Sequence, residues 1–176
     1  KDGRIAHEIL LELRAYHNQL ITDLVPSEQA KPLQKLLNYD LSNMGGLTVP
    51  LSEAQKSAVL GYGEIWSSRL LAALLNLNKL ESVSLDSRSF LRAERGTQPE
   101  VDRGLSWPLM QTVLTQHPQR RLVITGFMAQ NQVGETVLLG RNGSDYSATT
   151  IGALAEVSKV TIWSDVAGVY SADPEK

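Results

Sequence analysis

The chain has 176 residues, of which 42% are hydrophobic and 20% are charged, and its formal net charge is −2. This composition is typical of one globular domain and provides no basic surface of the kind that binds nucleic acid. The lack of cysteine excludes disulfides and thiolate metal sites, and no apolar run approaches the roughly 20 residues that cross a bilayer. We therefore expect a cytoplasmic protein that contacts neither nucleic acid nor membrane.

Residues 1–80 are predicted to be mainly helical. Apolar residues recur at three- and four-residue steps and predict a first helix with one apolar stripe, formed by Ile5, Ile9, Leu13, Tyr16, Leu20 and Leu24. A second helix is predicted from about Glu28 to Tyr39, with Pro32 in its first turn. Residues 43–46 then predict a loop.

A pair of glycines, Gly61 and Gly63, is predicted to separate two further helices. The first follows Ser52, and the second runs from Glu64 to Leu77. Glycines allow a backbone to approach a ligand closely, and a carboxylate at the start of the second helix could bind a substrate ammonium group. The alternative is a loop followed by an acid that only complements the helix dipole.

Residues 81–176 are predicted to alternate between strand and helix. Short apolar runs predict strands at 83–85, 122–125 and 160–163, and the intervening patterns predict helices at 105–116 and after residue 144. Short buried strands separated by helices predict a parallel α/β sheet. Ligands of such sheets bind beyond the carboxyl ends of the strands, here at Asp86, 125–127 and 164–165.

The most informative segment is Leu139–Asp145, with the sequence LGRNGSD. It places a glycine-rich turn, a positive charge and a carboxylate before an apolar-periodic helix, whose first turn is predicted near Ser144. The free N–H groups of a helix start bind anions, and Arg141 can add a bidentate grip on a carboxylate or phosphate. The alternative is purely structural: an Asn-Gly turn, a serine N-cap, and Asp145 complementing the dipole.

The segment after the last predicted strand, 164–170, could bind a nucleotide. Asp165 would lie near the ribose or a phosphate-bound metal, and Tyr170 would lie against the base. The alternative is a connecting loop that Tyr170 anchors in the core. No metal-binding residue is predicted from the histidines, because the His-Glu pair at His7 lacks the second histidine of an H-E-x-x-H motif.

Four sequence motifs occur in order along the chain: GEIWSSRL at 63–70, ITGF at 124–127, LGRNGSDYSA at 139–148 and VTIWSDVAGVYSADP at 160–174. Together they resemble the motifs of aspartokinases, within the amino-acid kinase superfamily. The asparagine of GRNGSD is similar to that of bifunctional aspartokinase/homoserine dehydrogenases. FLRAER at 90–95, with the first motif, most resembles their methionine-associated type II.

The resemblance implies an α/β fold of the amino-acid kinase kind, a three-layer αβα sandwich with a mainly parallel sheet that is incomplete in this fragment. Residues 1–176 would form the central part of the catalytic domain. The implied reaction transfers the γ-phosphoryl group of ATP, with Mg²⁺, to the side-chain carboxylate of L-aspartate. This is the first step toward lysine, threonine and methionine.

The resemblance also implies roles for individual residues. Glu64 would bind the substrate ammonium group and Arg141 its α-carboxylate, and Ser144 would be a further substrate-binding residue. Asp145 would lie beside the reacting carboxylate and organise cations, so Arg141 and Asp145 are the predicted catalytic residues. The predicted ATP-site residues are Ser164, Asp165, Tyr170 and, as the floor of the site, Gly126 and Phe127.

The chain departs from the family pattern at both ends. The family's K-[FY]-G-G-[ST] loop, whose lysine neutralises the transferring phosphoryl group, and its V-V-S-A loop do not occur, since Lys1 lies beyond both. Glu175 follows Asp-Pro where the family usually has arginine. We therefore expect this fragment to lack kinase activity, and we expect its exposed sheet edges to favour homo-oligomers.

Two other functions stay open. One is another amino-acid kinase, acting on glutamate or acetylglutamate, although the pairing of Glu64 with Arg141 favours an α-amino acid with both ends free. The other is a non-catalytic interaction module in which the long helices form an interface. Titration with ATP and aspartate separates this module from a kinase.

Overall fold

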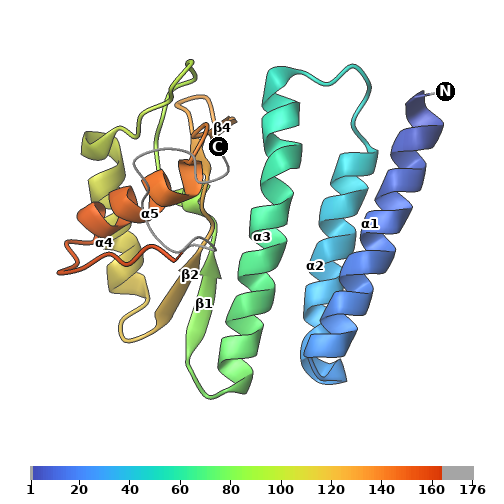
Figure 1. Cartoon of the computed structure of the whole chain (residues 1–176), viewed down its shortest axis with the longest axis horizontal. Helices are drawn as coiled ribbons and strands as arrows, with labels where there is room; N and C mark the ends of the chain where they lie inside the picture. Colours follow the sequence, from blue (N-terminus) through green and yellow to red (C-terminus); the bar gives the residue numbers. More distant parts are fainter. Residues whose placement is uncertain (1, 164–176) are drawn as a thin grey trace, which may run out of the picture.

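The computed structural model describes residues 2–163, with side chains from residue 6 onward. This part of the chain contains five α-helices, one 3₁₀ turn and two small sheets. Helices α1, α2 and α3 lie on one side, and the strands with α4 and α5 lie on the other (Figure 1). The predicted α/β class is confirmed. None of the helices in residues 2–163 is long and apolar enough to cross a membrane.

The helical half consists of α1 (Asp2–Leu24), α2 (Ser27–Gly45) and α3 (Glu53–Leu77). Helix α3 lies between the α1–α2 pair and the strands (Figure 1). It begins with a capping box, in which Ser52 Oγ accepts from the Gln55 N–H at 3.2 Å and Gln55 Oε1 accepts from the Ser52 N–H at 2.8 Å. These two bonds satisfy N–H groups that have no partner within the helix.

Helix α2 starts close to its predicted position but differs from the prediction in its end and in the place of Pro32. It continues to Gly45, through part of the predicted loop, and Pro32 lies beyond its first turn. A proline there forfeits one backbone hydrogen bond. Packing of the helix outweighs the tendency of Pro32 to interrupt it, because Leu37, Asp40 and Leu41 are all buried.

Helix α3 is continuous, so the predicted break at the glycine pair is wrong. A Cβ on Gly61 would lie 2.1 Å from the Sδ atom of Met128, whereas a Cβ on Gly63 would meet nothing within 4 Å. Gly61 therefore lets the helix pack closely on a strand and does not make a turn. As a result, Glu64 lies in the middle of α3 and not at a helix start.

This contrast gives opposite expectations for two alanine substitutions. Gly63→Ala should raise the free energy of unfolding by about 0.5–1 kcal/mol, since alanine is the better helix former. Gly61→Ala should lower it by about 1–3 kcal/mol, because the new Cβ would force the fully buried side chain of Met128 to shift. Urea denaturation of the 176-residue chain measures both, and a gain in stability at Gly61 would contradict the packing argument.

The apolar stripe predicted for α1 is wrong at several positions. Ile9, Tyr16 and Leu24 are exposed by 49%, 65% and 44%. The face that packs on α2 and α3 is shifted by about one residue from the predicted stripe at most positions. It contains Leu10, Leu13, His17 and Ile21. Periodicity could not choose between two adjacent stripes. The half-buried imidazole of His17, whose ring centroid lies 4.6 Å from that of Trp66, occupies the packed face.

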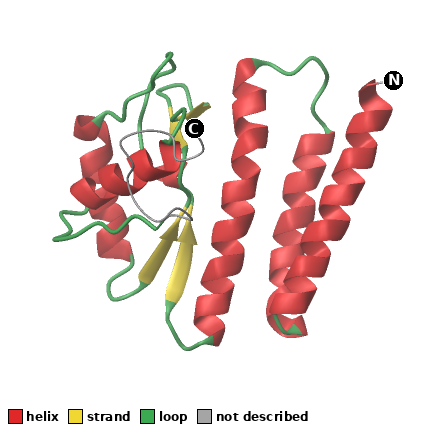
Figure 2. Cartoon of the chain, in the orientation of Figure 1, coloured by secondary structure: helices red, strands yellow, loops and turns green. Residues whose placement is uncertain are grey.

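The other half contains the predicted parallel pair of strands. Strand β1 (Ser82–Leu85) pairs with β2 (Arg121–Ile124) in parallel. Helix α4 (Arg103–Gln116) connects them, and its N-cap Asp102 accepts from the Leu105 N–H at 3.0 Å. Helix α3 lies on one side of these strands, and α4 and α5 (Gly143–Leu154) lie on the other (Figure 2).

An antiparallel hairpin was not predicted. It joins β3 (Met128–Gln130) to β4 (Thr136–Leu138), and Asn131 closes its turn by accepting from the Glu135 N–H at 2.8 Å. Three-residue strands are too short for an alternating pattern to reveal. The hairpin also separates two apolar cores, since Met128 packs with α1–α3 and Ala129 packs with α4 and α5.

The strand predicted at 160–163 is wrong for this structure. These residues form no strand, and Val160, Ile162 and Trp163 are exposed by 41%, 43% and 91%. A strand is held by hydrogen bonds to a neighbouring strand. None of the strands in residues 2–163 pairs with this segment, so its β-branched composition has no ladder to join.

Candidate functional site

The candidate site is built around the start of α5. The turn before this helix uses two left-handed backbone conformations, with φ of 78° at Gly140 and 60° at Asn142. The helix starts at Gly143, next to the predicted position, and Asp145 lies in its first turn. The N-cap is Asn142 and not serine, and its side chain makes no capping hydrogen bond.

The first turn of α5 therefore offers unused donors. Among residues 2–163, the N–H groups of Ser144 and Asp145 have no hydrogen-bond partner. Free N–H groups and the positive end of the helix dipole both favour an anion. The helix start and its free N–H groups agree with the sequence-based prediction, and the binding of an anion there stays a prediction.

The carboxyl end of β2 packs directly against this helix start. A Cβ on Gly126 would lie 3.5 Å from the Cα of Ser144, and a Cβ on Gly143 would lie 2.7 Å from the Cδ2 of Phe127. Phe127 itself has a left-handed φ of 68°, which is unusual for a residue other than glycine. The structure thus brings the predicted floor residues against the start of α5, Gly126 against Ser144 and Phe127 against Gly143.

A groove of about 570 Å³ opens beside the same helix start. Residues 97–100 form one wall, and 139–142 with the first two turns of α5 form the other. Tyr146 joins the walls, since its hydroxyl accepts from the Val101 N–H at 2.9 Å. Arg141 and Asp145 both line the groove and are exposed.

Two of the charged side chains that line this groove, Arg141 and Asp145, are available for a ligand; Glu100 lines its other wall. In the described part of the chain, neither Arg141 nor Asp145 makes a side-chain hydrogen bond or ion pair. A planar guanidinium beside free backbone donors suits a carboxylate or phosphate.

Glu64 is not among the residues that line this groove. It lies on α3, one turn after Gly61, on the helix side that packs on β3. Its half-buried carboxylate has no hydrogen-bond partner within residues 2–163. The other predicted site residues, Ser164, Asp165 and Tyr170, lie outside the described residues.

Asp86, which was predicted to face a ligand beyond the carboxyl end of a strand, is already paired with Arg88. Arg88 Nε donates to its two carboxylate oxygens at 2.9 and 3.0 Å, and Arg88 Nη1 donates to Thr136 Oγ1 at 2.9 Å. The hydrogen bonds that Arg88 donates to the Asp86 carboxylate raise the pKa of the Arg88 guanidinium. Asp86 therefore orients Arg88 at the end of β1 and is not a free ligand.

A buried hydroxyl network at the strand ends was missed by sequence reasoning. Thr125 Oγ1 accepts from the Ser87 N–H and donates to Ser87 Oγ, both at 2.9 Å, and Ser87 Oγ donates to the Met128 carbonyl at 2.7 Å. These bonds hold the ends of β1 and β2 to the hairpin. Serine and threonine after a strand are too common to signal such a network.

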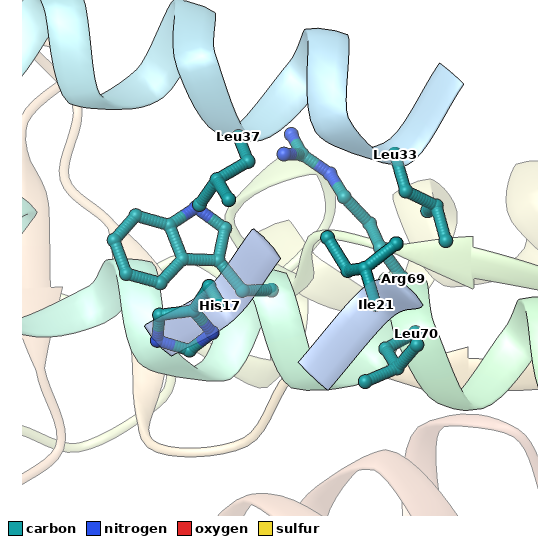
Figure 3. Close-up of a pocket in the computed structure, with 7 residues that line it drawn as sticks. His17, Ile21, Leu33, Leu37, Arg69 and Leu70 are labelled. Carbon is teal, nitrogen blue, oxygen red and sulfur yellow. The ribbon is translucent and has the colours of Figure 1, made fainter. Parts of the chain in front are cut away.

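A second hollow, of about 20 Å³, lies between the three long helices (Figure 3). It has room for about one water molecule, so it is a packing feature and not a ligand site. Beside it, Asp40 accepts from Trp66 Nε1 at 3.0 Å and from Arg69 Nη1 at 2.6 Å. Burial lowers the pKa of His17 on one wall.

Tyr62 lies in the same region of α3 and stacks on Trp66 with ring centroids 5.7 Å apart. Burial raises the pKa of its hydroxyl, and the nearby Asp40 carboxylate raises it further. Tyr62 therefore stays neutral at physiological pH. In residues 2–163 there is no cluster of three or more histidine, aspartate or glutamate side chains that could hold a metal ion.

Comparison with known proteins assigns this architecture. The amino acid kinase family model matches residues 7–176. The chain is 56% identical to the bifunctional aspartokinase/homoserine dehydrogenase 2 of Escherichia coli (strain K12), over 99% of this chain and 22% of that protein. It is 31% identical to the aspartokinase of Chlamydia pneumoniae, over 98% of this chain and 38% of that protein.

The fold is also similar to that of a solved structure, E. coli aspartokinase III in complex with lysine and aspartate. The TM-score is 0.83 at 24% identity, over 96% of this chain and 39% of that one. The described strands and helices thus correspond to part of a larger known fold. The chain spans about a fifth of the length of the bifunctional relative.

Proposed function

The chain belongs to the amino acid kinase family, and we propose that it carries the aspartate-binding part of an aspartokinase catalytic domain. The proposed reaction moves the γ-phosphoryl group of ATP to the side-chain carboxylate of L-aspartate and yields 4-phospho-L-aspartate, toward lysine, threonine and methionine. The proposal includes a homoserine dehydrogenase in the same polypeptide, because the relative at 56% identity carries both names.

The start of α5 carries the proposal. Unused N–H groups, the Arg141 guanidinium and the Asp145 carboxylate meet at one groove of about 570 Å³. In the proposed complex, Arg141 grips the α-carboxylate of aspartate, and Ser144 with the helix dipole adds to its binding. Glu64, which lies on α3, binds the ammonium group of the substrate.

Asp145 and the floor act on the reacting end of the substrate. Asp145 lies beside the side-chain carboxylate of the bound aspartate, and Gly126 and Phe127 limit where that carboxylate can lie. When bound with ATP, Mg²⁺ neutralises phosphate charge, and one carboxylate such as Asp145 suits an ion that is held mostly by phosphates and water. Ser164, Asp165 and Tyr170 remain the predicted contacts to ATP.

The 176-residue chain by itself is proposed to be inactive and to self-associate. The exposed segment at 160–163, with Trp163 exposed by 91%, supports self-association. The combination of a free carboxylate, Glu64, with Arg141 suits a free α-amino acid and so disfavours acetylglutamate, whose amino group carries no charge. The preference for aspartate over glutamate rests on the likeness to aspartokinases.

A chimera tests the function directly. These 176 residues would replace their counterpart in the E. coli bifunctional aspartokinase/homoserine dehydrogenase 2, which aligns with almost the entire chain. We expect ATP-dependent phosphorylation of L-aspartate, measured by coupled ADP release, with no turnover of glutamate or acetylglutamate. A folded chimera that retains homoserine dehydrogenase activity but phosphorylates no amino acid would contradict the proposal.

A further inference from the structure

Ser147 is a fully buried residue in the second turn of α5, and its hydroxyl bridges two parts of the candidate site. The Oγ atom accepts from the backbone N–H of Phe127 at 3.1 Å and donates to the carbonyl of Ser144 at 2.9 Å. One side chain thus connects the end of β2 to the first turn of the anion-binding helix.

The contact is close because Gly126 allows it. A Cβ at this position would lie 3.2 Å from Ser147 Oγ, so a larger residue would push the strand end away from the helix. Phe127, the next residue, has a left-handed φ of 68°. Its N–H is held by Ser147, and its carbonyl accepts from the Leu139 N–H at 2.9 Å.

Such a backbone conformation persists in a residue other than glycine only when its surroundings hold it. Two hydrogen bonds hold Phe127 from opposite sides, and the Phe127 ring lies against Gly143 at the start of α5. Without the Ser147 hydroxyl, the half-buried Phe127 N–H would face an alanine methyl and lose its acceptor. The backbone would relieve this by rotating, and the ring would move relative to the helix start.

We infer that Ser147 is a positioning residue, which sets the separation between the Gly126–Phe127 floor and the helix start that holds the substrate carboxylate. The inference rests on the proposed function, because that function places aspartate against both of these parts. Ser147 would not touch the substrate. It acts through Phe127 and Ser144.

The test compares Ser147→Ala with Ser106→Ala in the chimera. Ser106 is a matched control, since it is also fully buried in a helix and its Oγ accepts one backbone N–H, that of Arg92, at 2.9 Å. Ser147→Ala should raise the KM for aspartate about tenfold and leave the KM for ATP within about twofold. Ser106→Ala should leave both unchanged, because a smaller folded fraction lowers the rate but not KM.

A second measurement uses the 176-residue chain. Amide hydrogen exchange at Phe127 should become faster in Ser147→Ala and stay unchanged in Ser106→Ala. An unchanged KM for aspartate in Ser147→Ala, or equal changes of KM in Ser147→Ala and Ser106→Ala, would overturn the inference. The proposed function would still stand in that case, provided that the parent chimera is active. An inactive parent chimera would overturn the proposed function and the inference with it.

Discussion

Arg141→Ala in the chimera should lower kcat/KM for L-aspartate by about 100-fold. A bidentate, charge-assisted contact between a guanidinium and a carboxylate is among the stronger polar contacts in proteins, and about 1.4 kcal/mol corresponds to each tenfold loss. No other cationic side chain lines this groove in the described part of the chain. Steady-state kinetics with aspartate varied at saturating ATP measures the loss.

Two further variants test whether the loss of kcat/KM comes from a specific contact between Arg141 and a carboxylate. Arg141→Lys keeps the charge but not the planar fork, so we expect a smaller loss, of about tenfold. Arg121 is an exposed arginine at the opposite end of β2, and Arg121→Ala should leave kcat/KM unchanged. Equal losses in Arg141→Ala and Arg121→Ala would mean that general surface charge, and not a specific carboxylate contact, supports activity.

Asp40→Ala should lower the free energy of unfolding of the 176-residue chain by about 3–5 kcal/mol. Asp40 is exposed by only 5%, and its Oδ2 accepts from both Trp66 Nε1 and Arg69 Nη1. Removing the carboxylate leaves a largely buried guanidinium and an indole N–H without an acceptor. Urea denaturation followed by tryptophan fluorescence measures the loss, and Trp66, one of the partners, is the buried one of the chain's three tryptophans.

The exposed pair of Glu53 and Lys56 supplies the comparison. Its two groups lie 2.7 Å apart but are open to solvent, and Glu53→Ala should leave the denaturation midpoint unchanged. A second comparison replaces the buried pair by apolar residues, as Asp40→Leu with Arg69→Met. This double variant should be more stable than Asp40→Ala alone, because it leaves no unpaired charge. Wild-type stability in Asp40→Ala would contradict the account.

Elements that are determined mainly by their own residues could be predicted from local sequence patterns. Helices α1 and α4 and strands β1 and β2 were predicted from periodicity and composition, close to their observed bounds. The start of α5 was predicted as well, because glycines and a first-turn acid are local signals. The resemblance to aspartokinases, read from four motifs, agrees with the family match.

The wrong predictions all depend on residues that are distant in sequence. Gly61 looked like a helix break, because its contact with Met128 is not visible from neighbouring residues. The stripe of α1 was misplaced because His17 packs on Trp66, which lies on another helix. The positioning of Phe127 by Ser147 could not be predicted for the same reason. Glu64 was expected at a helix start, but it lies in the middle of α3 because that helix continues through both glycines.

The α5 helix starts with an N-cap residue, Asn142, whose side chain makes no capping hydrogen bond. An incoming carboxylate would supply the acceptor that a capping side chain supplies in other helices. The substrate would then complete an element of secondary structure, and part of its binding free energy would come from the backbone of the protein. A residue that capped this helix would stabilise the empty protein and compete with the substrate. In the proposed complex, affinity and resting stability would thus be opposed at this position, and an incomplete helix end would be the state that favours binding.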